Sequence, residues 1–210
     1  MPVKVFLIAL LLIASGSTSA QLKAEPITSP DTIYKLEGYS VHAPIGDDWF
    51  LIFQDNQSVG FGKRKISPTH AFTATATSTR TNKKIKTLAE IVAYVKKGNA
   101  ASIDPQRETL LKNDAVTDEE APAPLCAGYR LKTEDRGVPG THITLLKLSY
   151  GIVCVHPTVP NLLVDVGYSE RGREDELNSK ILQDEGVDFV NGLKFESTAN
   201  VGGSKVVPIQ

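Results

Sequence analysis

The chain is poor in the residues that most often carry chemistry. Its 210 residues include four histidines, two cysteines, one methionine and one tryptophan. No histidine has a partner at the H-E-x-x-H spacing of zinc enzymes. The segment "LSYG" lacks the first glycine of a G-x-S-x-G nucleophile elbow, and "VGFGKRK" departs from the G-x-x-x-x-G-K-[ST] phosphate loop. These absences exclude the enzyme classes that such short motifs identify.

The chain also lacks an excess of charge of either sign. Lysine and arginine number 23, aspartate and glutamate number 24, and the formal net charge is −1. A dedicated nucleic-acid-binding surface needs a positive footprint. The basic clusters at 63–65 and 83–84 are short and lie next to predicted turns, which is typical of solvated strand edges. We therefore expect no nucleic-acid partner.

The N-terminal segment "MPVKVFLIALLLIASGSTSA" has the pattern of a secretory signal peptide. Lys4 is its one charged residue, residues 5–14 are apolar, and residues 15–20 are small or polar. The apolar run is too short for a bilayer, which needs about 20 residues. We predict a signal peptide over 1–20, cleaved after Ala20, and a mature chain with no membrane span in the periplasm or outside the cell. The alternatives are a buried N-terminal strand or a membrane anchor.

Short strands and two helices are predicted for the remainder. Residues 21–31 are polar and contain two prolines, which is typical of a flexible lead-in, and residues 197–210 are predicted to form a disordered tail. Residues 32–196 form one domain. Its strands are expected near 34–44, 49–53, 58–65, 70–79, 107–116, 125–135, 143–155 and 161–170. Helices are predicted from a capping box at Thr87 and Glu90 to a stop at Gly98 and Asn99, and over about 174–193.

The lengths of the connections predict the fold class. Most neighbouring strands are joined by hairpin-length turns, which produce an antiparallel sheet. The chain is therefore predicted to be α+β, with one central antiparallel sheet and helices packed on it. Thr73, Thr75 and Thr77 alternate with apolar residues and would form an outer, polar face of the sheet.

Three segments together resemble a known family. They are "YSVHAPIGDDW", the helix that follows "TNKKIKTLAEIVAYV", and "VCVHPTVPNLLVDVGYSERG" before a final helix ending in "VNGLKFES". Over residues 32–196 this resembles the extrinsic photosystem protein PsbP and its bacterial exported relatives. The resemblance implies an α-β-α sandwich with a central antiparallel sheet. It implies little about function, because the family mostly holds accessory and uncharacterised exported proteins, and it transfers no binding residues.

Cys126 and Cys154 flank the turn predicted at 136–140. In an exported protein a single pair of cysteines is usually disulfide-bonded, and we predict that bond here. A symmetric hairpin centred near Val138 would place Cys126 opposite Gly151. The bond therefore requires a bulge, an asymmetric turn, or strands that are not direct neighbours. Free buried thiols are one alternative, and a reactive Cys154 beside His156 is another.

Few residues of the chain could bind a metal ion. His42, His70, His142 and His156 are scattered along the chain, and Asp47 with Asp48 could contribute to a weak cation site. The structural alternative for the two aspartates is a turn that leads into a buried Trp49. We expect no metal, no cofactor and no catalytic residue.

The predicted function is an exported, non-catalytic binding or accessory module whose partner is another envelope or secreted protein. The sheet edges and the threonine-rich face would be available to that partner. One alternative is a secreted hydrolase-type enzyme whose residues converge only in the fold. A deep pocket containing Arg130, His142 or His156 with a carboxylate would favour it. The other alternative is a metal-dependent accessory protein. The sequence does not decide the oligomeric state.

Overall fold

The structure, a computed structural model, describes residues 25–63, 67, 69–117, 121–137, 143–177 and 180–196. The predicted signal peptide, the predicted tail and His142 lie outside the described residues. Within the described part of the chain, no helix combines the length and the apolar character needed to cross a membrane.

Eleven strands, two α-helices and one 3-10 turn follow one another along the described chain. They are β1 (Glu25–Pro26), β2 (Ile33–Leu36), β3 (Tyr39–His42), β4 (Trp49–Gln54), β5 (Ser58–Lys63), β6 (Ala71–Arg80), α1 (Leu88–Ala101), β7 (Glu108–Thr117), β8 (Cys126–Asp135), β9 (Leu145–Val155), β10 (Leu162–Gly172), η1 (Glu174–Glu176), α2 (Lys180–Asn191) and β11 (Lys194–Phe195).

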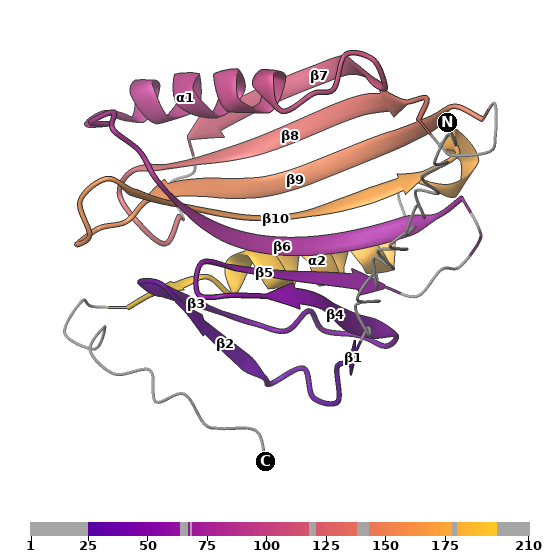
Figure 1. Cartoon of the computed structure of the whole chain (residues 1–210), viewed down its shortest axis with the longest axis horizontal. Coiled ribbons are helices and arrows are strands. Elements are labelled where there is room, and N and C mark those ends of the chain that lie inside the picture. The colour runs from indigo at the N-terminus through magenta and orange to yellow at the C-terminus, as the bar shows by residue number, and fades with distance from the viewer. Residues whose placement is uncertain are drawn as a thin grey trace, which may run out of the picture.

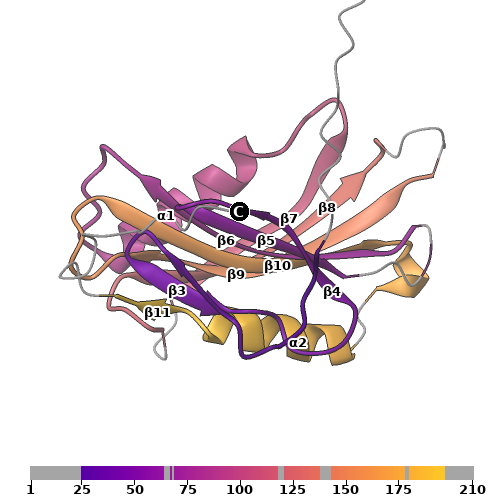
Figure 2. The same ribbon diagram turned by 60° about the horizontal axis from the view of Figure 1, so that its bottom comes forward.

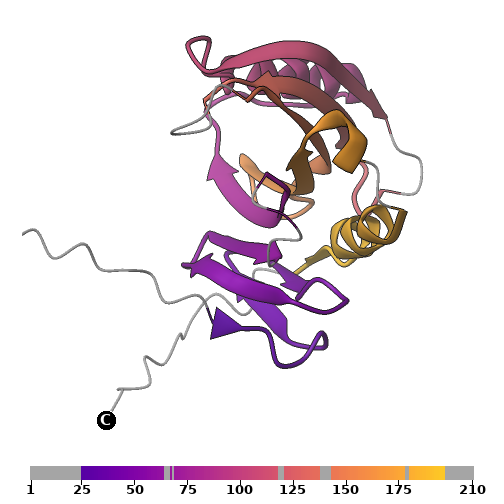
Figure 3. The same ribbon diagram turned by 90° about the vertical axis from the view of Figure 1, so that its right-hand side faces the viewer.

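Eight strands form the main sheet, in the order β1-β4-β5-β6-β10-β9-β8-β7 (Figure 1). Every neighbouring pair is antiparallel. The sheet is strongly curved, as the side view in Figure 3 shows. The predicted α+β class with a central antiparallel sheet is therefore confirmed.

A second, smaller sheet holds three strands in the order β11-β3-β2. The prediction of a single sheet is wrong in this respect. Gly38, at φ +81°, reverses the chain between β2 and β3, a conformation that costs glycine little. After α2, β11 returns to pair with β3. That pairing joins segments from opposite ends of the domain, and no local pattern in the sequence indicates it.

Residues 25–31, which were predicted to be a flexible lead-in, contribute structure to the main sheet. Glu25 and Pro26 form β1 against β4. The amide of Ile27 donates to the carbonyl of Trp49 at 3.0 Å, and the Ile27 side chain packs against the core. This apolar contact fixes the segment at the edge of the sheet despite its polar composition.

The two helices lie on opposite faces of the main sheet (Figure 2). At the start of α1 the predicted capping box is confirmed, with Thr87 and Glu90 each satisfying a backbone amide of the other. The predicted stop at Gly98 is wrong, because α1 continues to Ala101. An interior glycine costs a helix only about 1 kcal/mol relative to alanine. The last turn is closed by a hydrogen bond from the Ser102 amide to the Gly98 carbonyl.

The second helix is shorter than predicted. Its predicted first turn is the 3-10 turn η1, and α2 itself runs from Lys180 to Asn191. Gly186 lies where α2 packs on β10: a Cβ atom there would come within 2.4 Å of the Tyr168 ring. A glycine at this position therefore allows the close packing of α2 on β10.

Alternation along the central strands divides the core in two. On β10, Val164 and Val166 point toward the α2 side, and Leu163 points toward the α1 side. On β9, Cys154 belongs to the α2 side and Val153 to the α1 side. Both faces of the central strands are therefore covered, which explains their nearly continuous apolar sequence.

The predicted disulfide is present between Cys126 and Cys154. The two residues are direct cross-strand partners, and the β8–β9 register continues without a shift as far as the pair of Asp135 and Leu145. The bulge considered above is therefore absent from the described pairing, and the register centres the hairpin on residue 140 and not on Val138; residues 138–142 of the connection lie outside the described residues.

Candidate functional site: a groove between α2 and strands β7 to β10

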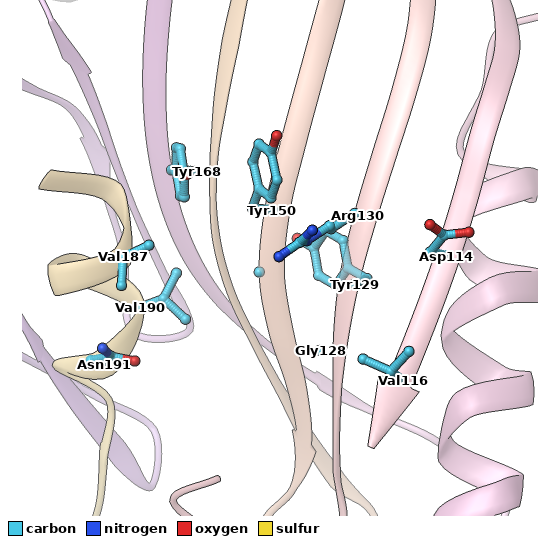
Figure 4. Close-up of a pocket in the computed structure, with 11 residues that line it drawn as sticks. Asp114, Val116, Gly128, Tyr129, Arg130, Tyr150, Tyr168, Val187, Val190 and Asn191 are labelled. Carbon is cyan, nitrogen blue, oxygen red and sulfur yellow. The ribbon is translucent and has the colours of Figure 1, made fainter. Parts of the chain in front are cut away.

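A groove of about 430 Å³ opens between α2 and the strands beyond it (Figure 4). The main sheet is wider than the helix that covers this face. α2 packs on β10, and the same face of β7, β8 and β9 continues past it. The groove is lined by Asp114, Val116, Gly128, Tyr129, Arg130, Tyr150, Gly151, Tyr168, Val187, Val190 and Asn191.

Four side chains form a row across the floor of the groove. Strand register pairs Tyr168 with Tyr150, Tyr150 with Arg130, and Arg130 with Asp114. Directly paired residues project to the same side of a sheet, so the row spans four strands. The rings of Tyr150 and Tyr168 stack with centroids 5.3 Å apart and an interplanar angle of 17°. The Arg130 guanidinium lies 5.8 Å from the Tyr150 ring centroid.

The charge of Arg130 is not neutralised within the groove. Asp114, its cross-strand neighbour, forms its ion pair with Lys112 at 2.8 Å. Among the described residues, no carboxylate forms an ion pair with Arg130, whose contact is the ring of Tyr150. A guanidinium on an aromatic ring retains its donors for an incoming anion. The groove therefore has an available positive charge.

The Tyr168 hydroxyl is a hydrogen-bond donor at neutral pH. Burial, assisted by the neighbouring Tyr150 and Glu170, raises the pKa of Tyr168 to about 12, and the nearby Arg130 opposes this rise. The Tyr168 phenol accordingly keeps its proton, and its ring stacks on that of Tyr150 to form a largely apolar floor.

The walls of the groove are apolar and accessible. Val116 on β7 is 62% exposed and Val187 on α2 is 50% exposed. At Gly128 a Cβ atom would meet a single backbone oxygen at 3.9 Å, so the space above the floor is open. A site that encloses a small molecule buries most of its surface. This groove instead has exposed valine walls and is bordered by the edge strand β7, a geometry that suits part of a larger partner.

His156 has a structural role. It is buried; its Nε2 donates to the carbonyl of Gly38 at 2.6 Å, and its Nδ1 accepts from the amides of Thr158 and Val159. Both ring nitrogens are therefore engaged. Because Cys154 is in the disulfide, the alternative of a Cys154 nucleophile with His156 as its base is wrong.

The other described histidines lie apart from one another. His70 Nε2 is 2.8 Å from Glu170 Oε1 in a buried pair, and His42 Nδ1 donates to the carbonyl of Ala43 at 2.7 Å. No group of three or more potential metal ligands occurs among the described residues. The expected absence of a metal site stays a prediction.

Asp47 and Asp48 lie in an exposed turn. Trp49, which follows them, is buried, and its indole N–H donates to Glu185 Oε2 at 3.0 Å. The predicted turn that leads into a buried tryptophan is therefore confirmed.

Of the groove residues, Arg130 was anticipated from the sequence as a possible site residue, and its neighbours were not. Tyr150, Tyr168 and Asp114 lie on three other strands, far from Arg130 along the chain. Only the register brings them together. The sequence gives only a weak indication of this grouping. Each of these residues occupies a position that the alternation of side chains along its strand places on the α2 side.

A separate ion-pair cluster on the α1 side is built around Asp135. This carboxylate is fully buried and accepts two hydrogen bonds from Arg107, at 2.8 and 2.7 Å, and one from Arg171 at 3.1 Å. The Arg107 hydrogen bonds, together with the Gly137 amide and Arg171, hold the pKa of Asp135 well below its usual range. Both guanidiniums are committed to this carboxylate, so the cluster stabilises the fold.

Asp135 predicts a specific pH dependence of stability. Its folded-state pKa lies below its unfolded value, so its contribution is present above about pH 4 and is lost as the pH falls further. Asp135→Asn should lower the free energy of unfolding by about 2 kcal/mol at pH 7 and by much less near pH 2. Urea denaturation at both pH values checks this, and an equal loss at both would contradict it.

The comparisons with known proteins find likeness in structure alone. No family model matches the chain, and no curated protein matches it. One similar solved structure is LpqN, involved in cell envelope biogenesis of Mycobacterium tuberculosis, at 11% identity and a TM-score of 0.45 over 83% of this chain and 91% of that one. Another is the Saccharomyces cerevisiae Ran-binding protein Mog1p, at 7% identity and a TM-score of 0.39 over 78% of this chain and 94% of that one. Likeness at this level carries no conclusion about family or function, and the PsbP-like assignment stays a prediction.

Proposed function

We propose that the chain is an exported, non-catalytic binding module of the cell envelope or extracellular space. Its binding surface is the groove between α2 and strands β7 to β10, and its ligand is an acidic, apolar segment of a partner polypeptide. The observation that carries the proposal is Arg130, a cation without a carboxylate ion-pair partner among the described residues, set on an aromatic floor in an open groove.

The chemistry of the groove supports this ligand class. An aspartate or glutamate on the partner would accept charge-assisted hydrogen bonds from the Arg130 guanidinium. An adjacent aromatic or aliphatic side chain would cover Tyr150 and Tyr168 between the valine walls. β7 borders the groove and pairs only with β8 among the described strands, so a bound segment also has a strand edge beside it.

The geometry gives less support to the hydrolase alternative. Arg130 and Asp114 do line one groove, as that alternative requires, but Asp114 is paired with Lys112. His156 is absent from the described lining and both of its nitrogens are engaged elsewhere. An open surface with apolar walls favours binding over catalysis.

A display selection of random peptides against the purified chain tests the proposal. Enriched peptides should place Asp or Glu within a few positions of an aromatic or aliphatic residue. Arg130→Glu should weaken a selected peptide by at least about tenfold, because a lost charge-assisted hydrogen bond is worth about 1.5–3 kcal/mol. Fluorescence anisotropy with the labelled peptide measures the dissociation constant.

Lys35→Glu is the matched control. Lys35 is an exposed cation on β2, outside the groove, and its reversal makes the same change in net charge. It should leave the affinity within about twofold, as expected for a distant surface charge. Enrichment of basic peptides, or an equal loss in both variants, would overturn the proposal.

A further inference from the structure

The opposite face of the sheet contains a second cavity, of about 240 Å³, beside α1. α1 packs over β7, β8 and β9, and the same face of β10 and β6 extends beyond the helix. The threonine-rich face of β6 therefore meets the side of α1. The cavity is lined by Thr77, Thr79, Tyr94, Val95, Gly98, Asn99, Ser102, Val153, Leu163 and Asp165.

Asp165 lies on the floor of this cavity. Its partners in the sheet are Thr77 on β6 and Val153 on β9. Its Oδ1 accepts a hydrogen bond from the Tyr129 hydroxyl at 3.2 Å. Among the described lining residues it is the one charged group, and no lysine or arginine accompanies it. Burial raises the pKa of Asp165 to about 6, although the Tyr129 hydrogen bond opposes that rise. At neutral pH the cavity therefore holds a carboxylate without a counter-charge.

Other lining residues carry oxygen acceptors. The Asn99 amide nitrogen donates to Asn113, which leaves the Asn99 side-chain oxygen free to accept. The hydroxyls of Thr77 and Thr79 add two further acceptors to the lining. The cavity thus combines one negative charge with several neutral oxygens.

Gly98 lines the cavity on the helix side. It occupies the interior of α1, where glycine is a poor helix former. A Cβ atom built there would meet nothing within 4 Å. Packing therefore does not require a glycine at this position. A larger side chain at this exposed position has open space around it at the edge of the cavity.

We propose that this cavity binds a primary ammonium group, carried by a small amine or by a lysine side chain of another polypeptide. An ammonium supplies three donors and one positive charge, which match the Asp165 carboxylate and the neutral oxygens around it. A divalent metal ion would need more ligands than the single carboxylate provides. This site is on the opposite face from the α2 groove and is independent of the function proposed for that groove.

Amide NMR of the full chain at pH 7.5 tests the assignment, with n-butylammonium and N-acetyl-lysine methylamide as probes. Both should shift the amides of Thr77, Gly98 and Asn99. n-Butanol, which has the same alkyl chain without the charge, should not. A response to both amines supports a site open to either source. A response to n-butylammonium alone supports a small amine, and a response to the lysine derivative alone supports a polypeptide lysine.

Two variants test separately the charge of Asp165 and the free volume of the cavity. Asp165→Asn keeps the shape of the side chain and removes its charge, and Gly98→Leu adds apolar volume to the lining without changing a charge. Each should weaken amine binding at least tenfold while leaving the remaining spectrum folded. Asp31→Asn, at an exposed position far from the cavity, should change nothing. The inference is overturned if no amine shifts these amides, if n-butanol acts equally, or if Asp165→Asn binds as well as the native chain.

Discussion

Replacing both cysteines, in the double variant Cys126→Ala/Cys154→Ala, should lower the free energy of unfolding by about 3–4 kcal/mol. The disulfide closes a loop with a sequence separation of 28 and joins directly paired residues of β8 and β9. Both cysteines are buried in the α2-side core. Their loss relaxes the constraint on the unfolded chain and also removes packing volume. Urea denaturation of the variant and the native protein measures the difference.

The reduced native chain serves as the control, because it loses the bond and keeps both sulfur atoms in place. It should unfold at a urea concentration between those of the oxidised native protein and the double variant, because it keeps the packing volume that the two alanines lose. Intact mass of protein taken from its native compartment, with and without reductant, tests the oxidation state and cleavage after Ala20 together. Two alkylatable thiols in the unreduced, denatured protein would contradict the account.

Replacing Lys63, the ion-pair partner of Glu185, should lower the free energy of unfolding about as much as the loss of the disulfide does. Lys63 Nζ lies 2.8 and 2.5 Å from the two carboxylate oxygens of Glu185, and both side chains are about nine-tenths buried. The Trp49 indole completes the cluster, which ties α2 to β4 and β5. Lys63→Met leaves an uncompensated buried carboxylate and should cost about 3–5 kcal/mol. The double variant Lys63→Met/Glu185→Gln should recover much of that loss, as measured by urea denaturation.

Lys180→Met is the matched control for this prediction. Lys180 forms an ion pair with Asp184 at 2.9 Å on the same helix, but its side chain is 86% exposed. An exposed pair at this spacing contributes about 0.3–0.5 kcal/mol. Equal losses of unfolding free energy in Lys63→Met and Lys180→Met would show that burial does not determine how much the Lys63–Glu185 pair contributes to stability.

Local features of the fold could be read from the sequence because their causes are local. The capping box at Thr87 needs residues three apart, and the alternation of Val164 and Val166 with Leu163 needs only neighbouring positions. The predictions failed where distant segments decide the structure. β11 pairs with β3, from opposite ends of the described chain. Gly98 stays helical because the cost of an interior glycine is small and the hydrogen bonds of α1 continue past it.

The groove was harder to predict than the fold. The row formed by Tyr168, Tyr150, Arg130 and Asp114 depends on the register of four strands. The groove also depends on how much of the sheet α2 covers. A one-residue shift of β9 would turn Tyr150 to the other face, away from Arg130 and Tyr168. The disulfide is the one link across this region that the sequence did predict, and it fixes the register of β8 against β9.

Amide NMR of the labelled chain, titrated with a selected acidic peptide, tests the binding proposal most directly. The account predicts shifts concentrated at Arg130, Tyr150 and Val187, lost in Arg130→Glu and retained in Lys35→Glu. Shifts that map to the α1 face or to β2, or that persist in Arg130→Glu, would contradict it.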